Sequence, residues 1–163
     1  MPPELLDILR TIDSSPVHEA MRQWRWLYPA VNTAHILGIA LILGSILPLD
    51  ARMMGAFRTV PFNPLARVLI PTAVFGIFLA TATGALLFTT DAVKYATTPL
   101  FQVKLGLIGL AIVNALVLRA ARDWPPALGS NFTGTTRRLR WTGAISALLW
   151  LGALVSGRLL GYL

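Results

Sequence analysis

Residues 30–49 read AVNTAHILGIALILGSILPL, in which His35 is the only titratable side chain. A hydrocarbon core about 30 Å thick needs roughly 20 apolar residues in a helix, so this stretch predicts a membrane span. Similar stretches occur at about 68–90, 100–118 and 141–163. The sequence therefore predicts an all-α fold, namely a polytopic membrane protein with a four-helix transmembrane bundle.

The overall composition supports the same class. Of the 163 residues, 55% are hydrophobic and 13% are charged, and the mean hydropathy is +0.66. A soluble domain of this size cannot bury so much apolar material in one core. The chain has no cysteine, which excludes disulfides, thiolate metal sites and cysteine nucleophiles. The net charge of +7 comes from basic residues between the apolar runs. We therefore expect these residues to set the membrane topology, and we expect no nucleic-acid binding.

Residues 1–29 lack the basic start and apolar centre of a signal peptide. A second short helix is predicted to begin at Ser15 and Pro16, with His18 as a solvated interfacial side chain, and Pro29 is predicted to separate it from the first span. We interpret 1–29 as N-terminal interfacial helices and 30–163 as one domain. The first helix is predicted to be amphipathic and to lie on the bilayer, because apolar residues recur at helical spacing, at Leu5, Ile8, Leu9 and Ile12.

Basic residues are unevenly divided between the two ends of the predicted spans. The N-terminal segment and the second connection hold four Lys and Arg residues, whereas the first and third connections hold eight. The positive-inside rule places the richer side in the cytoplasm. The sequence therefore predicts a bacterial inner-membrane protein with both termini in the periplasm.

Two ionisable side chains, His35 and Lys104, lie inside predicted spans, where such groups are costly and usually functional. Arg158 lies at a matching depth near the end of the fourth span. At about 1.5 Å per residue, all three begin about 6 to 8 Å below the periplasmic boundary. Lys94 follows the second span on the same side. We expect one polar site that opens to the periplasm and no comparable site at the cytoplasmic end.

The residue types of this layer suit a haem b. A neutral imidazole is a common metal ligand, and the glycine that follows His35 by one turn, Gly38, leaves room for a flat macrocycle. Lys104 would be a second iron ligand or an electrostatic partner. Arg158, with its planar fork, and Lys94 would pair with the propionates.

Structural interpretations of the same residues remain open. Glycines in spans commonly serve close helix packing, and a lone histidine often hydrogen-bonds a neighbouring helix. Lysine and arginine one turn from a helix end commonly extend to the membrane surface. His35, Lys104 and Arg158 each admit such a role. The small residues of the last span indicate either packing within the bundle or a homo-oligomer contact.

Two runs carry a family resemblance. Residues 26–55 read WLYPAVNTAHILGIALILGSILPLDARMMG, and residues 91–110 read DAVKYATTPLFQVKLGLIGL. With these runs and a glycine-rich last helix, the chain resembles a bacterial family of uncharacterised four-helix inner-membrane proteins, from about residue 26 to its end. More distantly, it is similar to HemJ-type protoporphyrinogen oxidases and to CopD-like or cytochrome b-type membrane proteins.

The distant resemblance rests on a histidine in the first helix, an arginine just past its end and a lysine early in the third helix. These positions are His35, Arg52 and Lys104, and in HemJ-type proteins the matching histidine and lysine are implicated in haem b binding. Cytochrome b-type proteins normally hold two haems with four histidines, but this chain has only His18 and His35. We therefore expect at most one haem, so electron passage across the membrane would need a quinol or a redox protein partner.

The sequence thus predicts an integral membrane haem b-binding protein that takes part in redox or electron-transfer chemistry near the periplasmic face. HemJ-like oxidoreductase activity is its enzymatic interpretation. The alternative is a non-catalytic membrane subunit or anchor of a larger inner-membrane complex. A small transporter and a metal-handling protein have weaker support, because the chain shows no internal repeat and no Met-rich or His-rich tract.

Overall fold

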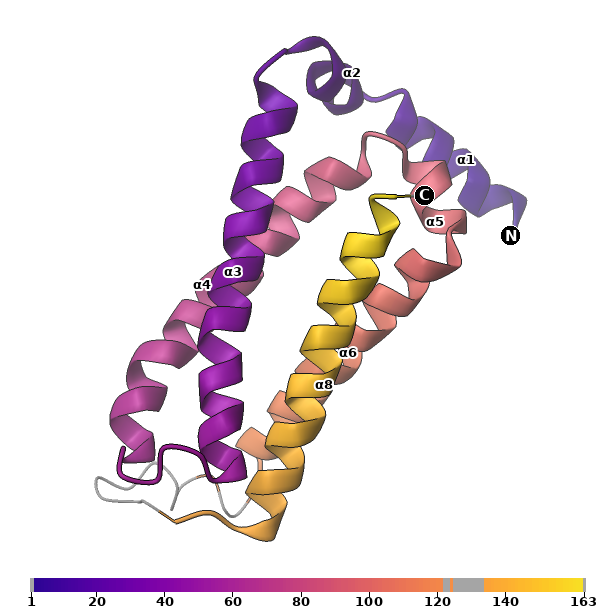
Figure 1. The fold of residues 1–163 in the computed structure, drawn as a ribbon. Coiled ribbons are helices and arrows are strands. Elements are labelled where there is room, and N and C mark those ends of the chain that lie inside the picture. Colours follow the sequence, from indigo (N-terminus) through magenta and orange to yellow (C-terminus); the bar gives the residue numbers. More distant parts are fainter. Residues whose placement is uncertain (1, 122–123, 125–133, 163) are drawn as a thin grey trace.

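The computed structural model describes residues 2–121, 124 and 134–162, and its described elements are all helical (Figure 1). Four of the helices are long and apolar enough to cross a membrane, namely α3, α4, α6 and α8. The prediction of an all-α, multi-pass membrane protein is confirmed. The helices are α1 (Pro3–Asp13), α2 (Pro16–Gln23), α3 (Leu27–Met54), α4 (Phe62–Phe88), α5 (Ala92–Thr97), α6 (Pro99–Arg119) and α8 (Arg137–Leu160).

Local sequence explains where these helices begin and end. The Ser15 side chain accepts a hydrogen bond from the His18 N–H at 3.3 Å, which caps α2 as predicted. Gly55 ends α3 with a φ of +110°, a conformation that favours glycine. The prediction that Pro29 separates α2 from the first span is wrong. Pro29 lies in the first turn of α3, where a backbone N–H has no acceptor within the helix, so proline loses no hydrogen bond there.

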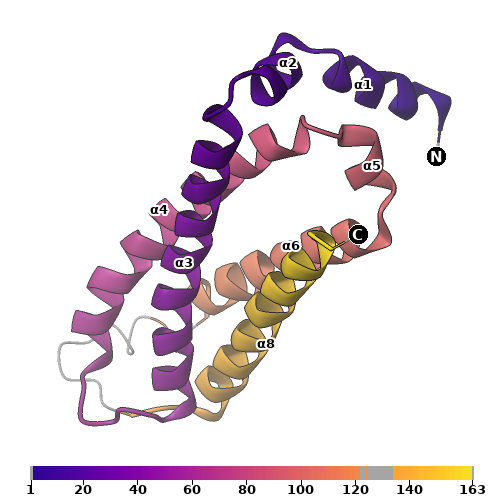
Figure 2. The ribbon, with the colours of Figure 1, turned by 45° about the horizontal axis from the view of Figure 1, so that its top comes forward.

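The four long helices form an open row. α3 packs against α4 on one side and α8 on the other, and α8 also packs against α6. Within the described residues, α4 and α6 make no comparable contact, so they stand at the two ends of the row. Figures 1 and 2 show that the α3–α4 and α6–α8 pairs meet near the α3–α4 connection and separate toward α1, α2 and α5.

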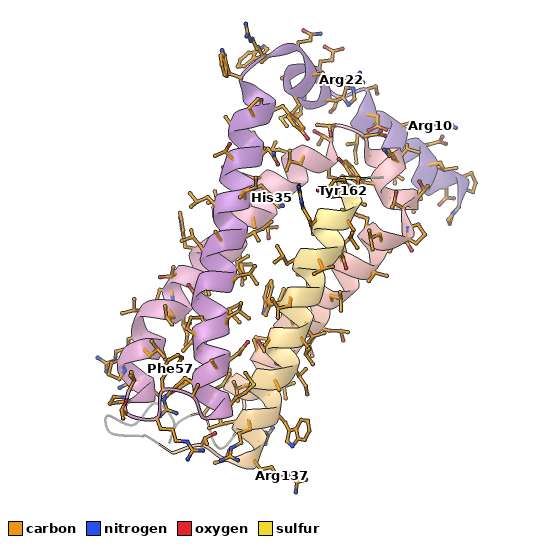
Figure 3. The ribbon with its side chains drawn as sticks, in the orientation of Figure 1. Arg10, Arg22, His35, Phe57, Arg137 and Tyr162 are labelled. Atoms are coloured by element: carbon orange, nitrogen blue, oxygen red, sulfur yellow. The ribbon has the colours of Figure 1, made fainter. Side chains whose placement is uncertain are left out.

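The buried side chains follow this shape. Six of them, including Phe62 and Leu139, form a core cluster near the end of α3. A second cluster, formed by Ile42, Ala111 and Trp150, lies halfway along the helices. The buried clusters therefore lie at the narrower end and midway along the bundle, whereas His35 lies toward the wider end (Figure 3).

The N-terminal helices lie across this wider end (Figure 1). The Asp13 carboxylate accepts hydrogen bonds from the backbone N–H groups of Ala92 at 2.6 Å and Val93 at 3.3 Å, which attaches α1 to the start of α5. His18 Nδ1 lies 2.8 Å from the Thr89 carbonyl oxygen, so His18 is half-buried and bonded rather than solvated as predicted. The apolar side chain of Ile8 on α1 is 58% exposed, as expected for a helix that lies on a bilayer.

Candidate functional site

His35 lies on the face of α3 that packs against α4. Its Nδ1 is 3.0 Å from the Ala80 carbonyl oxygen and 3.1 Å from the Thr83 hydroxyl oxygen. That hydroxyl donates to the Leu79 carbonyl at 2.6 Å, so it is free to accept from the ring. Both partners of Nδ1 are therefore acceptors, and the hydrogen of the neutral imidazole belongs on Nδ1. Nε2 keeps its lone pair and has no hydrogen-bond partner among the described residues.

Glycines on α4 and α3 determine where this imidazole sits. A Cβ atom at Gly84 would lie 3.0 Å from Cε1 of His35, so the ring packs directly over that glycine. Gly38 faces α4 rather than open space, because a Cβ there would lie 2.7 Å from the Ala80 backbone nitrogen. The prediction that Gly38 leaves room for a macrocycle is therefore wrong, and its role is close helix packing.

Lys104 reaches the same region from α6. A Cβ atom at Gly157 of α8 would lie 3.3 Å from both Cε and Nζ of Lys104, so the lysine side chain passes over that glycine. Nζ has no hydrogen-bond or ion-pair partner in the described part of the chain. The structure thus places both ionisable residues that the sequence singles out within the spans toward the wider end of the bundle.

The other two predicted site residues lie at the same end, but neither contacts His35 through an observed bond. The exposed Arg158 donates from Nη2 to the Tyr162 hydroxyl at 2.8 Å, and its guanidinium lies 4.9 Å from the centroid of that ring. Lys94 is exposed on α5, and its backbone N–H donates to the Asp91 carboxylate at 3.3 Å. Their assignment to haem propionates remains a prediction.

An aromatic cluster that the sequence analysis missed closes the corner between α4, α5 and α6. Tyr95 lies with its ring centroid 6.3 Å from Phe88 and 5.9 Å from Phe101, and these two phenylalanines stack at 5.6 Å. Burial raises the pKa of Tyr95 above its usual value, so the phenol remains neutral at physiological pH. No periodic signal identifies this cluster, because its three members come from different helices.

A second polar centre lies at the opposite end of α3. Asp50 is 2% exposed, and its Oδ2 has no hydrogen-bond partner in the structure. Arg52 is 1% exposed, and its Nε donates to the Val60 carbonyl at 2.8 Å. The expectation of no comparable polar site at this end is therefore wrong.

Asp50 escaped the sequence analysis because it follows the last apolar residue of the predicted span, Leu49. The helix continues to Met54, which carries Asp50 into the contact between α3 and α8. There, a Cβ atom at Gly143 would lie 2.9 Å from the Asp50 carbonyl oxygen, so the two backbones almost touch. Arg52, which the resemblance groups with His35, lies about 25 Å further along the helix.

We expect Asp50→Val to raise the free energy of unfolding by about 1 to 3 kcal/mol. Valine has a similar volume, and it removes a buried oxygen without a partner. Reversible unfolding in mixed detergent and sodium dodecyl sulfate measures the change. Asp7→Val, at an exposed position paired only with the exposed Arg10, should change stability by less than about 0.5 kcal/mol. Destabilisation by Asp50→Val would reveal a partner that compensates the carboxyl group.

The described residues contain no group of three or more histidine, aspartate or glutamate side chains that could hold a bare metal ion. A metal at His35 would therefore need most of its ligands from a cofactor. Comparisons with protein-family models, curated proteins and solved structures give no match to this chain.

Proposed function

We propose that the protein binds one haem b at the wider end of the bundle and takes part in redox or electron-transfer chemistry. The observation that supports this proposal most directly is the hydrogen bonding of the two ring nitrogens of His35. Its Nδ1 is held by a backbone carbonyl and a hydroxyl, while Nε2 is left without a partner among the described residues. Metal-binding histidines almost always donate their second ring N–H in this way, which fixes the tautomer and orients the ring.

Lys104 gives this proposal a second group. Lys104 has no observed partner among the described residues, and its amine would serve as the other axial ligand or as a positive charge that stabilises the reduced state. Bound haem would supply the one-electron chemistry. The chain's own residues would orient the imidazole through Ala80 and Thr83 and, after a rotation of Arg158 away from Tyr162, neutralise a propionate.

The proposed location follows from the distribution of basic residues. The end with His35 has few of them, which favours a periplasmic position in a bacterial inner membrane, with a quinol or a redox protein as electron partner. An oxidoreductase similar to the HemJ type is the enzymatic form of this proposal. At this end, the His35 Nε2 and the Lys104 Nζ both have no hydrogen-bond partner among the described residues.

The second candidate is a non-catalytic subunit or anchor of a membrane complex. It is favoured by α6, whose described buried residues are only Ala111 and Leu118. Such a face suits either lipid or a neighbouring subunit. In this case Lys104 would pair with a group of that neighbour.

Visible spectroscopy of the purified full-length protein tests the haem proposal. We expect a Soret band that shifts on dithionite reduction and sharp b-type bands in the reduced state. Extraction as a pyridine complex should give about one haem per chain. A colourless protein that is folded by circular dichroism, and that gains no such spectrum when haem is added, contradicts the proposal and favours the non-catalytic subunit.

A further inference from the structure

We propose that a pocket at the start of α8 binds the phosphate-bearing headgroup of an anionic phospholipid. The pocket lies at the end of the bundle opposite His35, between the end of α3 and the start of α8, and has a volume of about 680 Å³. It is independent of the haem proposal. Its lining consists of Met54, Thr135, Arg137, Arg140, Trp141 and Ala144.

The two arginines that line the pocket suit a phosphate group. Arg137 and Arg140 stand three residues apart on α8, so their side chains emerge on neighbouring positions of one helix face. Neither guanidinium has an acidic partner among the described residues. Guanidinium groups bind phosphate oxygens through two parallel hydrogen bonds, which makes paired arginines a strong site for this anion.

The backbone around the arginines is held in place. Thr136 caps α8 by accepting a hydrogen bond from the Leu139 N–H at 3.2 Å. The Thr135 hydroxyl donates to the Met53 carbonyl at 2.5 Å, which ties the start of α8 to the end of α3. The positive end of the α8 dipole adds to the attraction for an anion between these residues.

The apolar half of the pocket favours a lipid over a free phosphate ion. Met54 is 42% exposed and Trp141 is 62% exposed, and both line the pocket beside Ala144. Met54 is the last residue of α3, and Arg137 is the first of α8, so the pocket lies where two apolar helices leave the hydrocarbon core. Tryptophan is enriched at that depth, where an indole contacts both acyl chains and headgroups.

The charge of this end of the protein supports the same ligand. Segments 50–67 and 119–140 contain eight arginines and only two acidic residues. The positive-inside rule places these segments at the cytoplasmic leaflet, where anionic lipids attract basic side chains. A basic pocket between spans at that surface is a suitable headgroup site.

Native mass spectrometry of the delipidated full-length protein tests this proposal. Phosphatidylglycerol and phosphatidylcholine with identical acyl chains are added separately, and we expect selective retention of phosphatidylglycerol. Replacing both arginines, in Arg137→Gln/Arg140→Gln, should weaken its retention by roughly 10- to 30-fold. Circular dichroism confirms that each variant is folded.

A matched variant separates a defined site from general charge attraction. Arg138→Gln/Arg67→Gln removes the same charge at the same end of the protein, but neither residue lines the pocket. It should retain phosphatidylglycerol as the unmodified protein does. Equal loss in both double variants, or equal binding of phosphatidylcholine, overturns the proposal. Displacement of the lipid by millimolar inorganic phosphate would assign the pocket to a free anion instead.

Discussion

Gly76→Val is expected to separate α3 from α4 and to destabilise the bundle by about 3 kcal/mol or more. A Cβ atom at Gly76 would lie 2.9 Å from the Gly38 carbonyl oxygen and 3.0 Å from the Ile42 nitrogen. These are backbone atoms, which cannot rotate away as a side chain does. Helices in a membrane associate through close packing at such small residues, because lipid provides little hydrophobic drive between them.

Two other glycines provide matched controls. A Cβ atom at Gly44 of α3 or Gly109 of α6 would meet no described atom within 4 Å. Gly44→Val and Gly109→Val should therefore leave stability unchanged or raise it by a few tenths of a kcal/mol, because valine has the better helix propensity. Unfolding in sodium dodecyl sulfate compares all three variants. Similar effects at the three positions would mean that α3 and α4 do not approach as closely as described.

The spans were predictable because their signal is physical and local. Twenty apolar residues in a row have few stable arrangements other than a membrane helix. The ends were less predictable, since backbone hydrogen bonds continue past the last apolar residue. The first span illustrates this, as its helix runs from Leu27 to Met54 rather than over 30–49. Asp50 consequently belongs to a helix contact rather than to a loop.

For the candidate site, the sequence predicted only how deep in the membrane its residues lie. Counting residues from the span ends placed His35 and Lys104 at one level, and in the structure both lie toward the wider end of the bundle. Their contacts depend on how each helix is rotated and tilted, which a single span sequence does not reveal. The acceptors of Nδ1, Ala80 and Thr83, lie 45 and 48 residues away on another helix. His35 packs over Gly84 and Lys104 packs over Gly157, and the sequence of a single span does not reveal these contacts.

For the proposed haem site, His35→Ala is expected to abolish the haem spectrum without unfolding the protein. The substitution removes the only histidine within the described spans, and its Nε2 has no partner among the described residues. It also removes a half-buried polar group, so the loss of packing is modest compared with a core truncation. Visible spectra, haem extraction and circular dichroism on the same samples separate loss of ligand from loss of fold.

The second histidine makes this experiment specific. His18 bonds to the Thr89 carbonyl at the end of α4 and has no part in the proposed site, so His18→Ala should keep its colour. Thr83→Val tests the tautomer argument, because it removes one of the two acceptors of Nδ1 while leaving Nε2 in place. We expect a spectrum of the same type with haem affinity lowered by about 10- to 100-fold. An unchanged spectrum in His35→Ala would show that the iron has another ligand, whereas loss of colour in His18→Ala alone would move the site to the surface helices.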